Sequence, residues 1–389
     1  MSKVKNLAII TTHPIQYYAP VFKLLQQRQH INIKVFYTWG QAAANKYDPG
    51  FGKNINWDLP LLDGYAYEWV NNKSADPGSH HFKGIVNPDL IQQVNSFKPT
   101  TILVFGWAYH SHLKAIRYFK NKLPVYFRGD STLLDAQTNL RSTLKTVILK
   151  WVYRHIDHAF YVGTNNKAYF KKYGLNDSQL TFAPHAIDND RFAASHNIEA
   201  EKLRNNLNIP AEAILILFAG KLEGKKAPSL LLKSVMSLNQ PNLHLLFVGD
   251  GALQKQLKET SAANSNIHFV DFKNQLEMPA IYQACNLFCL PSKGPGESWG
   301  LAVNEAMACK KAILVSDKVG CAVDLVKENY NGSIFKSDDK GDLLKQLALL
   351  TKSKVLLEEY GENSGNMIKN WSFIKIAEAI ENKLLHEKN

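Results

Sequence analysis

The chain has 389 residues, 45% of them hydrophobic and 11% aromatic, which suits two domains with full cores better than one. Its longest apolar runs have the length of strands and fall short of the roughly 20 residues that a transmembrane helix needs. The formal net charge is +12, and residues 1–200 hold 23 Lys and Arg against 13 Asp and Glu, so we expect the first half to meet an anionic partner, either a membrane surface, a lipid diphosphate or a nucleic acid.

The predicted strands are short apolar runs that alternate with helix-length amphipathic segments. The first run, at 7–11, follows a basic start but is brief and has no small-residue cleavage site after it, so we interpret it as a strand and not as a signal peptide. Residues 47–87 are rich in Gly, Asn, Asp and Pro and are expected to form an irregular surface insertion. Further strands are predicted at 31–37, 101–105, 124–127, 159–162, 180–183, 214–219, 243–248, 267–270, 287–290, 312–315 and 333–335.

Most of these runs are apolar at consecutive positions, which is typical of strands covered on both faces of a parallel sheet. Together with the strand–helix alternation, this predicts an α/β chain of βαβ units with right-handed crossovers. The rhythm breaks into a polar stretch near 192–210, and an amphipathic helix is predicted to follow Trp371. We therefore expect one domain at 1–200, a second at 201–368, and a closing helix at 369–389.

All four cysteines lie in the second half, and two of them stand in the apolar context ACNLFCL at 284–290. This context predicts buried, reduced thiols, because a zinc site would need more ligands at closer spacing. Reduced thiols lead us to expect a cytoplasmic protein.

The strongest chemical signal is the segment ESWGLAVNEAMA, which begins at Glu297 and follows several glycines. A helix beginning near Trp299 would direct its N-terminal amides at phosphate or hydroxyl oxygens. Glu297 and Glu305 stand about two helical turns apart, on nearly the same face, where they can accept hydrogen bonds from sugar hydroxyls. The alternative interpretation is a capping glutamate followed by a solvent-facing one.

A second signal is the segment FAGKLEGKK, in which a buried strand ends at Gly220 and lysines follow. Lysines at the carboxyl end of a strand can neutralise a diphosphate, and Lys221 and Lys226 are the candidates. The alternative is a solvated basic turn. A third strand ends in the tight turn VGDG at 248–251.

Taken in order, these pieces resemble glycosyltransferase family 4. The resemblance covers residues 214–335 almost continuously through AGKLEGKK, VGDGAL, FVDFKNQLEMPAIYQACNLFCLPS, ESWGLAVNEAMACKKAILVSD and NGSIF. Outside that range it rests on PHAID…RF at 184–192 and on WSF at 371–373. It implies a retaining enzyme with the GT-B fold, in which two Rossmann-like domains face each other and the last helix crosses back to the N-terminal domain.

The resemblance also implies residue roles in a C-terminal domain that binds a nucleoside diphosphate sugar. Lys221 and Lys226 would hold the diphosphate and stabilise it as the leaving group, while Glu297 would hold the hydroxyls of the donor sugar. Glu305 would bind the ribose. The further donor contacts would be Gly220, Phe272, Lys273, Ser298, Trp299, Gly300 and Leu301, with the base near Phe272 and Lys273.

Two departures from the family pattern stand in this domain. An arginine is commoner at the position of Lys221, and lysine keeps the charge but loses the bidentate fork. The segment 310–312 replaces the usual Gly-x-Pro. The family's GT-B members need no metal, and no cofactor other than the sugar donor is implied.

The N-terminal domain is expected to bind the acceptor, because loops at the carboxyl ends of strands line the crevice of open α/β folds. Arg128 stands where the family frequently has a histidine beside the donor sugar, or it pairs with Asp130 to brace the cleft. The imidazoles of His110 and His112 lack an obvious third ligand for a metal. The candidate acceptor or cleft residues are His13, Gln16, Tyr17, Trp107, His110, Arg128 and Asp130.

The segment Arg141–Arg154, RSTLKTVILKWVYR, mixes basic and apolar residues at helical spacing. It is a candidate for an anionic membrane surface, and the alternative is an ordinary amphipathic helix that packs on the sheet. We therefore expect a cytoplasmic enzyme that can associate peripherally with the inner membrane face.

The predicted function is transfer of a hexose from a UDP- or GDP-linked donor to an acceptor hydroxyl in bacterial cell-surface glycan or glycolipid synthesis. The alternative is a catalytically silent nucleotide-sugar-binding protein of the same fold. A Rossmann oxidoreductase would need G-x-G-x-x-G after the first strand, where this chain has TTHPIQYY. A nucleic-acid binder would show a steep salt dependence and no response to sugar nucleotides.

Overall fold

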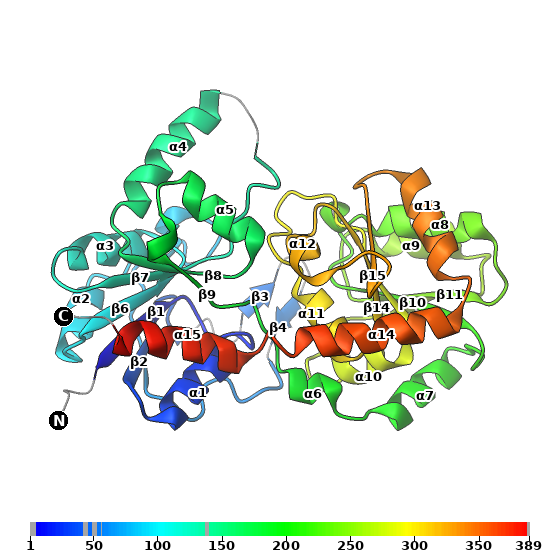
Figure 1. Ribbon diagram of the computed structural model, residues 1–389, viewed down its shortest axis with the longest axis horizontal. Coiled ribbons are helices and arrows are strands. Elements are labelled where there is room, and N and C mark those ends of the chain that lie inside the picture. The colour runs from blue at the N-terminus through cyan, green and yellow to red at the C-terminus, as the bar shows by residue number, and fades with distance from the viewer. Residues whose placement is uncertain (1–4, 42–45, 49–52, 56, 137–139, 387–389) are drawn as a thin grey trace. The chain divides into compact units, whose positions relative to one another are not determined.

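The computed structural model describes residues 5–41, 46–48, 53–55, 57–136 and 140–386, and Figure 1 shows the chain. The chain divides into two compact units. Unit 1 comprises Met1–Lys46, Pro60–His185 and Phe373–Asn389, and unit 2 comprises Tyr47–Leu59 and Ala186–Ser372. The division after His185 falls earlier than the expected boundary after residue 200, because α6 (Asn189–Ala193) already packs in unit 2, where Phe192 contacts Tyr282.

The sheet of unit 1 has seven strands in the order β5-β2-β1-β6-β7-β8-β9, and all neighbours pair in parallel. The order reverses between β1 and β6, which places the switch point of this sheet at their carboxyl ends. The strands are β1 (Asn6–Thr11), β2 (Asn32–Tyr37), β5 (Tyr67–Trp69), β6 (Thr101–Phe105), β7 (Val125–Arg128), β8 (His158–Tyr161) and β9 (Leu180–Phe182).

Helices cover this sheet because each carries an apolar stripe. The last helix, α15 (Phe373–Leu385), belongs to unit 1 and packs against α1 (Ala19–Arg28) and β9. There the buried carboxylate of Glu381 accepts a hydrogen bond from Arg28 Nε at 2.7 Å. The other helices of this unit are α2 (Leu90–Ser96), α3 (His110–Phe119), α4 (Leu140–Tyr153) and α5 (Thr164–Lys172).

The sheet of unit 2 has six parallel strands in the order β12-β11-β10-β13-β14-β15. Its order reverses between β10 and β13. The strands are β10 (Ile214–Ala219), β11 (Leu243–Val248), β12 (Ile267–Val270), β13 (Leu287–Leu290), β14 (Ala312–Ser316) and β15 (Gly332–Phe335). The helices, besides α6, are α7 (Asn197–Asn206), α8 (Pro228–Leu238), α9 (Gln254–Ser261), α10 (Met278–Ala284), α11 (Leu301–Ala308), α12 (Ala322–Leu325), α13 (Lys340–Leu350) and α14 (Lys354–Ile368).

The predicted α/β class with two Rossmann-like parallel sheets is confirmed. The interior strands are the predicted apolar runs, since β6, β11 and β14 are buried along their whole length. The expectation of an irregular segment at 47–87 is wrong in part. This segment contains β5, β4 (Lys53–Ile55) and most of β3 (Lys46–Asp48), and β3 and β4 form a two-stranded sheet. Each of these strands has three residues, which is too short to give an apolar run.

Two further predictions concern the cysteines and the length of the apolar helices. The four cysteines are all buried and form no disulfide, and burial raises the pKa of the Cys285 thiol to about 11. Among the described helices, none is both long and apolar enough to cross a bilayer.

Candidate functional site

The candidate donor site lies where the strand order of unit 2 reverses, because ligands of open α/β sheets bind outside the carboxyl ends of the strands at such a point. Two loops leave the sheet there, one after β10 and one after β13. They are joined by a backbone hydrogen bond of 2.8 Å from the amide of Lys293 to the carbonyl of Lys225. Lys221, Lys226, Glu297 and Glu305 belong to these two loops and to the helix that follows the second.

The loop after β10 begins at Gly220, whose φ is +148°. The neighbouring loop after β11 packs directly on it, since a Cβ at Gly249 would lie 2.2 Å from the Gly220 carbonyl oxygen. The amide of Leu222 donates to the carbonyl of Asp250 at 2.9 Å. The backbones of the loops after β10 and β11 are therefore in direct contact. Lys221, which is half-buried, directly follows Gly220 in the first of these loops.

Lys226 and Glu297 form an ion pair that joins the two loops. Ser292, two residues after the end of β13, donates a hydrogen bond to the same carboxylate oxygen, Oε2, at 2.8 Å. Both charged side chains are largely shielded, with 21% of Lys226 and 10% of Glu297 exposed. Lys226 is therefore no solvated cation, in contrast to Lys225, which is exposed and pairs with Glu223 at 3.3 Å.

The segment from Glu297 to Gly300 is fixed from behind by the turn that follows β14. The amide of Gly320 donates to the Glu297 carbonyl at 3.1 Å, and the amide of Cys321 donates to the Trp299 carbonyl at 2.9 Å. A Cβ at Gly320 would lie 1.8 Å from the Ser298 carbonyl oxygen, so only glycine allows this approach. Gly300, with φ +95°, then caps α11.

The helix α11 begins at the half-buried Leu301, two residues later than predicted from Trp299. The carboxylate of Glu305 is buried and accepts a hydrogen bond of 2.8 Å from the hydroxyl of Tyr282. The alternative of a solvent-facing helix glutamate is therefore wrong for Glu305. Trp299 is buried beside it and donates to Asn304 Oδ1 at 2.8 Å.

Phe272 and Lys273, the predicted neighbours of the base, follow β12 at the far end of the same sheet edge. The amide of Phe272 donates to Asp250 Oδ1 at 3.2 Å, which ties this loop to the turn after β11. Lys273 forms an ion pair with Glu277 at 2.7 Å on the surface. The structure thus brings Lys226, Glu297 and Ser292 into contact and fixes the other donor residues on adjacent loops.

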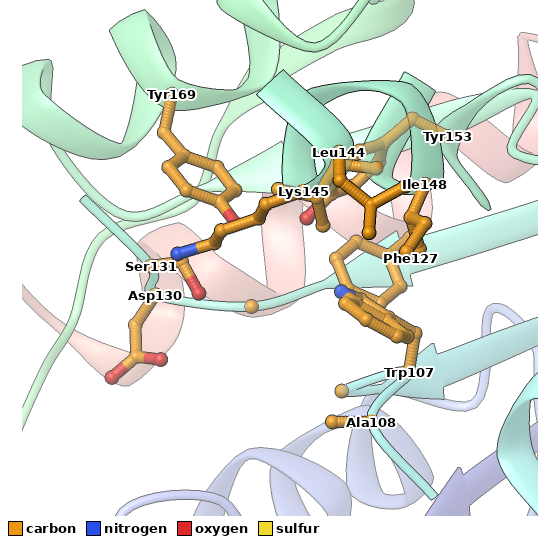
Figure 2. A pocket seen from close by; sticks show the side chains of 13 residues that line it. Trp107, Ala108, Phe127, Asp130, Ser131, Leu144, Lys145, Ile148, Tyr153 and Tyr169 are labelled. Carbon is orange, nitrogen blue, oxygen red and sulfur yellow. The ribbon is translucent and has the colours of Figure 1, made fainter. Parts of the chain in front are cut away.

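Unit 1 contains a pocket of about 560 Å³ at the carboxyl ends of β6 and β7, shown in Figure 2. Its walls are mainly apolar and aromatic. In Figure 2 the side chain of Lys145 extends from α4 in the direction of Ser131 and Asp130. The lining residues are Gly106, Trp107, Ala108, Phe127, Gly129, Asp130, Ser131, Leu144, Lys145, Ile148, Leu149, Tyr153 and Tyr169.

Of the candidate acceptor residues, Trp107 and Asp130 line this pocket, and the others lie elsewhere in unit 1. Arg128 departs from its expected role, because it is 1% exposed and its guanidinium donates to the carbonyls of Ala183 and Pro184 at 2.7 and 2.8 Å. Its side chain therefore ties the end of β7 to the segment after β9.

The remaining candidates follow β1 and begin α3. His13 lies beside Thr12 and Trp39, with its Nδ1 at 2.9 Å from Thr12 Oγ1. Gln16 is buried and Tyr17 is half-buried. His110 is the first residue of α3 and contacts the ring of Phe82.

The neighbouring imidazole of His112 is a core group. It is completely buried, with Nε2 at 2.8 Å from Thr38 Oγ1 and Nδ1 at 2.9 Å from the Gly106 carbonyl. Burial lowers the pKa of His112 to about 4.

Sequence reasoning missed three residues that hold this site together: Ser292, Tyr282 and Gly320. Ser292 could have been identified from the sequence, because it lies two residues after a buried strand at the switch point. The sequence carries no local signal that Tyr282 faces Glu305, since the two are 23 residues apart.

Comparison with known proteins finds similarity to glycosyl transferases. Residues 199–367 match the family model described as glycosyl transferases group 1. The chain is 24% identical over 299 residues to an uncharacterized glycosyltransferase of Methanocaldococcus jannaschii, covering 73% of this chain and 72% of that protein.

It is also 26% identical over 230 residues to a Campylobacter jejuni alpha-1,4-N-acetyl-D-galactosaminyltransferase named for a diphospho-undecaprenol-linked substrate, covering 58% and 59% of the two chains. In several other relatives, including a second protein of M. jannaschii at 44%, the match spans less than half of the relative's length.

Solved structures share the fold over the whole chain. The Anabaena protein HepE, determined in complex with UDP and glucose, superposes with a TM-score of 0.71 at 15% identity, covering 98% of this chain and all of that one. The lipopolysaccharide glycosyltransferase WaaG superposes with a TM-score of 0.68 at 15% identity. The predicted GT-B class is thereby confirmed, and the chain carries, over residues 199–367, the domain of the glycosyl transferases group 1.

Proposed function

We propose that this chain is a retaining glycosyltransferase of family 4 that transfers a sugar from a UDP- or GDP-linked donor to an acceptor hydroxyl. The observation that carries the proposal is the Lys226–Glu297 pair, which stands with Ser292 at the switch point of the unit 2 sheet. A cation beside a carboxylate at this place suits a ligand that carries both a diphosphate and neighbouring hydroxyls. Structures similar in fold include one determined with UDP and glucose.

In this proposal Lys221 and Lys226 contact the donor diphosphate. Glu297 uses Oε2 for Lys226 and Ser292, and Oε1 accepts a hydrogen bond from a donor hydroxyl. Glu305 accepts hydrogen bonds from the ribose. Because its carboxylate is buried and fixed by Tyr282, the ribose meets an acceptor group whose position is already set, which lowers the ordering cost of binding.

The chemical step follows from these positions. The bond between the anomeric carbon and the diphosphate oxygen lengthens toward an oxocarbenium-like state, and the two lysines stabilise the negative charge that develops on the diphosphate. The acceptor hydroxyl then attacks from the face that the diphosphate leaves, and its proton passes to a diphosphate oxygen. No carboxylate of the chain is assigned as a nucleophile, and no metal is assigned to the step.

For the acceptor we propose the pocket of unit 1. Its walls are apolar, and Lys145 adds a positive charge, which suits an acceptor that joins an apolar part to an anionic group, such as a lipid-linked glycan. The Campylobacter relative is named for a substrate of this kind. We place the reaction in bacterial cell-surface glycan or glycolipid synthesis on the cytoplasmic side of the inner membrane.

The surface of α4 supports peripheral membrane association. Its inner face is buried through Leu149, Val152 and Tyr153, whereas Val147 on the outer face is 62% exposed and Leu144, which also lines the pocket, is 63% exposed. In Figure 1 the N-terminal end of α4 rises away from the sheet of unit 1. The helix LRSTLKTVILKWVY carries basic residues and no acidic one, a composition that favours an anionic bilayer surface.

The proposal is tested in two stages. First, UDP, GDP and their sugar conjugates are screened by thermal unfolding, because a ligand at 100 times its Kd stabilises a protein by about 2.7 kcal/mol. Second, the best donor is incubated with lipid-linked acceptors and with water alone, and the configuration at the transferred anomeric carbon is determined by NMR. Binding without either transfer or hydrolysis would instead identify a catalytically silent binding protein.

Glu305→Ala provides the internal check, with Glu362→Ala as its control. Glu362 is an exposed glutamate of α14 that pairs with Lys310. We expect Glu305→Ala to lose the thermal shift given by the nucleotide, and Glu362→Ala to keep it. An unchanged thermal shift in Glu305→Ala would contradict the proposed contact between Glu305 and the ribose.

A further inference from the structure

A loop of unit 1 between β5 and α2 gathers three groups that commonly bind metal ions: Asp76, His80 and His81. One ligand atom of each lies within 4.8 Å of the others. The Nε2 atoms of His80 and His81 are both 3.2 Å from Oδ2 of Asp76. Ligand atoms in a tetrahedral zinc site, at bond lengths of about 2.0–2.2 Å, lie roughly 3.3–3.5 Å apart, and the distance from Asp76 Oδ2 to each imidazole nitrogen is close to that spacing. Nε2 of His81 also lies 3.0 Å from the main-chain carbonyl oxygen of Asp76, a contact that a bound ion would replace.

The loop reaches this arrangement through its own backbone. Asn72 closes it, with Oδ1 accepting from the amides of Ser74 and Val86 at 3.1 and 2.9 Å and Nδ2 donating to the Gly84 carbonyl at 2.9 Å. The amide of Gly78 donates to the same carbonyl at 3.0 Å. Because these bonds order the backbone that carries the three side chains, an ion entering the site has little chain to immobilise.

Two glycines make the close packing of the loop possible. A Cβ at Gly84 would lie 2.0 Å from the Gly78 carbonyl oxygen, so this contact excludes any side chain. A Cβ at Gly78 would lie 2.4 Å from Nδ1 of His80. The His80 ring therefore occupies its place beside Asp76 only because residue 78 has no side chain.

We propose that Asp76, His80 and His81 form a site for a divalent transition-metal ion of the zinc class, bound through two imidazole nitrogens and one carboxylate oxygen. Two imidazoles favour zinc, cobalt, nickel or copper over magnesium and calcium, which prefer oxygen ligands. Asp76 and His80 are exposed and His81 is half-buried, so the ion reaches the site from solvent, and water completes its coordination.

The site is separate from the proposed donor site, since its residues belong to unit 1 and the donor residues to unit 2. It has a structural consequence within unit 1. The loop lies on the start of α3, where the hydroxyl of Tyr109 donates to the Ser79 carbonyl at 3.4 Å. Tyr109 directly follows the pocket wall at Ala108, so an ion that fixes the loop also supports that wall.

The test uses the full chain without a histidine tag, treated with chelator and then dialysed. Isothermal titration with ZnCl2 is expected to show one ion per chain at this site, and Co²⁺ is expected to give the visible absorption of a four-coordinate centre. Asp76→Asn, His80→Ala and Gly78→Ala should each weaken the binding at least tenfold. His386→Ala, which removes an exposed histidine outside the loop, should leave it unchanged.

Folding of the variants is checked by circular dichroism, and the donor site by the thermal shift that the nucleotide gives. Absence of zinc binding in the wild type would overturn the proposal. Zinc binding that persists in both Asp76→Asn and His80→Ala would overturn it equally. Neither result tests the sugar-transfer proposal. That proposal would fail if no nucleotide or sugar nucleotide gave a thermal shift in the wild-type protein.

Discussion

The hydroxyl of Tyr282 donates a hydrogen bond of 2.8 Å to the buried carboxylate of Glu305, which joins α10 to α11. Removing one hydrogen bond from a buried acceptor costs about 1–3 kcal/mol. We expect Tyr282→Phe to lower the free energy of unfolding by this amount and to weaken nucleotide binding. Urea unfolding and titration calorimetry measure the two effects.

Tyr330→Phe is the matched control, because that ring is exposed. It should change neither quantity beyond error. If Tyr282→Phe behaved like the control in both measurements, the hydrogen bond would have no role in holding Glu305.

The contact between Lys226 and Glu297 predicts that removing the Lys226 side chain lowers kcat. Lys226→Ala removes a charge from the leaving group, and the loss of one such stabilising group costs about 10²–10³ in kcat. Lys226→Arg should recover part of the rate, since the charge is kept. Steady-state kinetics with the identified donor separate kcat from KM.

Lys225→Ala serves as the comparison, because Lys225 is the next residue, is exposed and pairs with Glu223. Its kcat should stay within about twofold of the wild type. Equal losses in Lys225→Ala and Lys226→Ala would show that general positive charge in this loop matters, and not the contact with Glu297.

Gly320→Ala should displace the segment that holds Glu297. The new Cβ would lie 1.8 Å from the Ser298 carbonyl oxygen, and the backbone hydrogen bond from Gly320 to Glu297 would lengthen. We expect a destabilisation of about 1–3 kcal/mol, in the range of an overpacked site, with weaker donor binding.

Gly224→Ala tests whether any added methyl in this region has the same effect. A Cβ at Gly224 meets no atom within 4 Å. The variant should therefore unfold at the same urea concentration as the wild type, and a comparable loss there would contradict the steric explanation for Gly320.

The stability of unit 1 should depend on pH through buried imidazoles. Burial lowers the pKa of His112 and that of His158 to about 4, whereas an unfolded histidine titrates near 6.5. Between these values the unfolded state binds more protons, so stability falls as the pH falls from about 6.5 to 4, by roughly 1 kcal/mol per pH unit for each imidazole.

Urea midpoints at pH 7 and pH 5 measure this dependence. His112→Gln should be less stable at pH 7, because the bonds to Thr38 and Gly106 change, but it should lose less stability on acidification than the wild type. An identical acid-induced loss in the variant would show that His112 is not buried in its neutral form.

The outer face of α4 predicts binding to anionic vesicles. Replacing Leu144 and Val147 together by glutamate removes two exposed apolar side chains and adds negative charge, which should reduce vesicle binding at least about tenfold. Sedimentation with vesicles, with and without anionic lipid and at two salt concentrations, measures it.

Ile198→Glu, at an exposed apolar position of α7 in unit 2, is the control for added charge and should bind vesicles like the wild type. Binding that does not respond to anionic lipid would contradict the role given to the basic residues of α4.

The fold was predictable because a strand that is buried on both faces of a sheet has apolar residues at consecutive positions in the sequence. Strands such as β10 and β11 are apolar at almost every position, and the glycines after them mark the sheet edge where ligands bind. The short β3 and β4 show no such pattern. Pairing between distant side chains leaves none either: nothing near Arg128 indicates that it turns to the carbonyls of Ala183 and Pro184, and nothing near Glu305 indicates Tyr282.

The return of the chain to unit 1 through α15 has a consequence for how the protein is made. Arg28 leaves the ribosome long before Glu381, its buried partner, which lies 353 residues later in the chain. Until α15 has been synthesised, the surface of α1 that α15 covers stays open to water and to other chains. Unit 2, whose sheet lies wholly between β10 and β15 in sequence, can finish folding before unit 1, although its synthesis begins later.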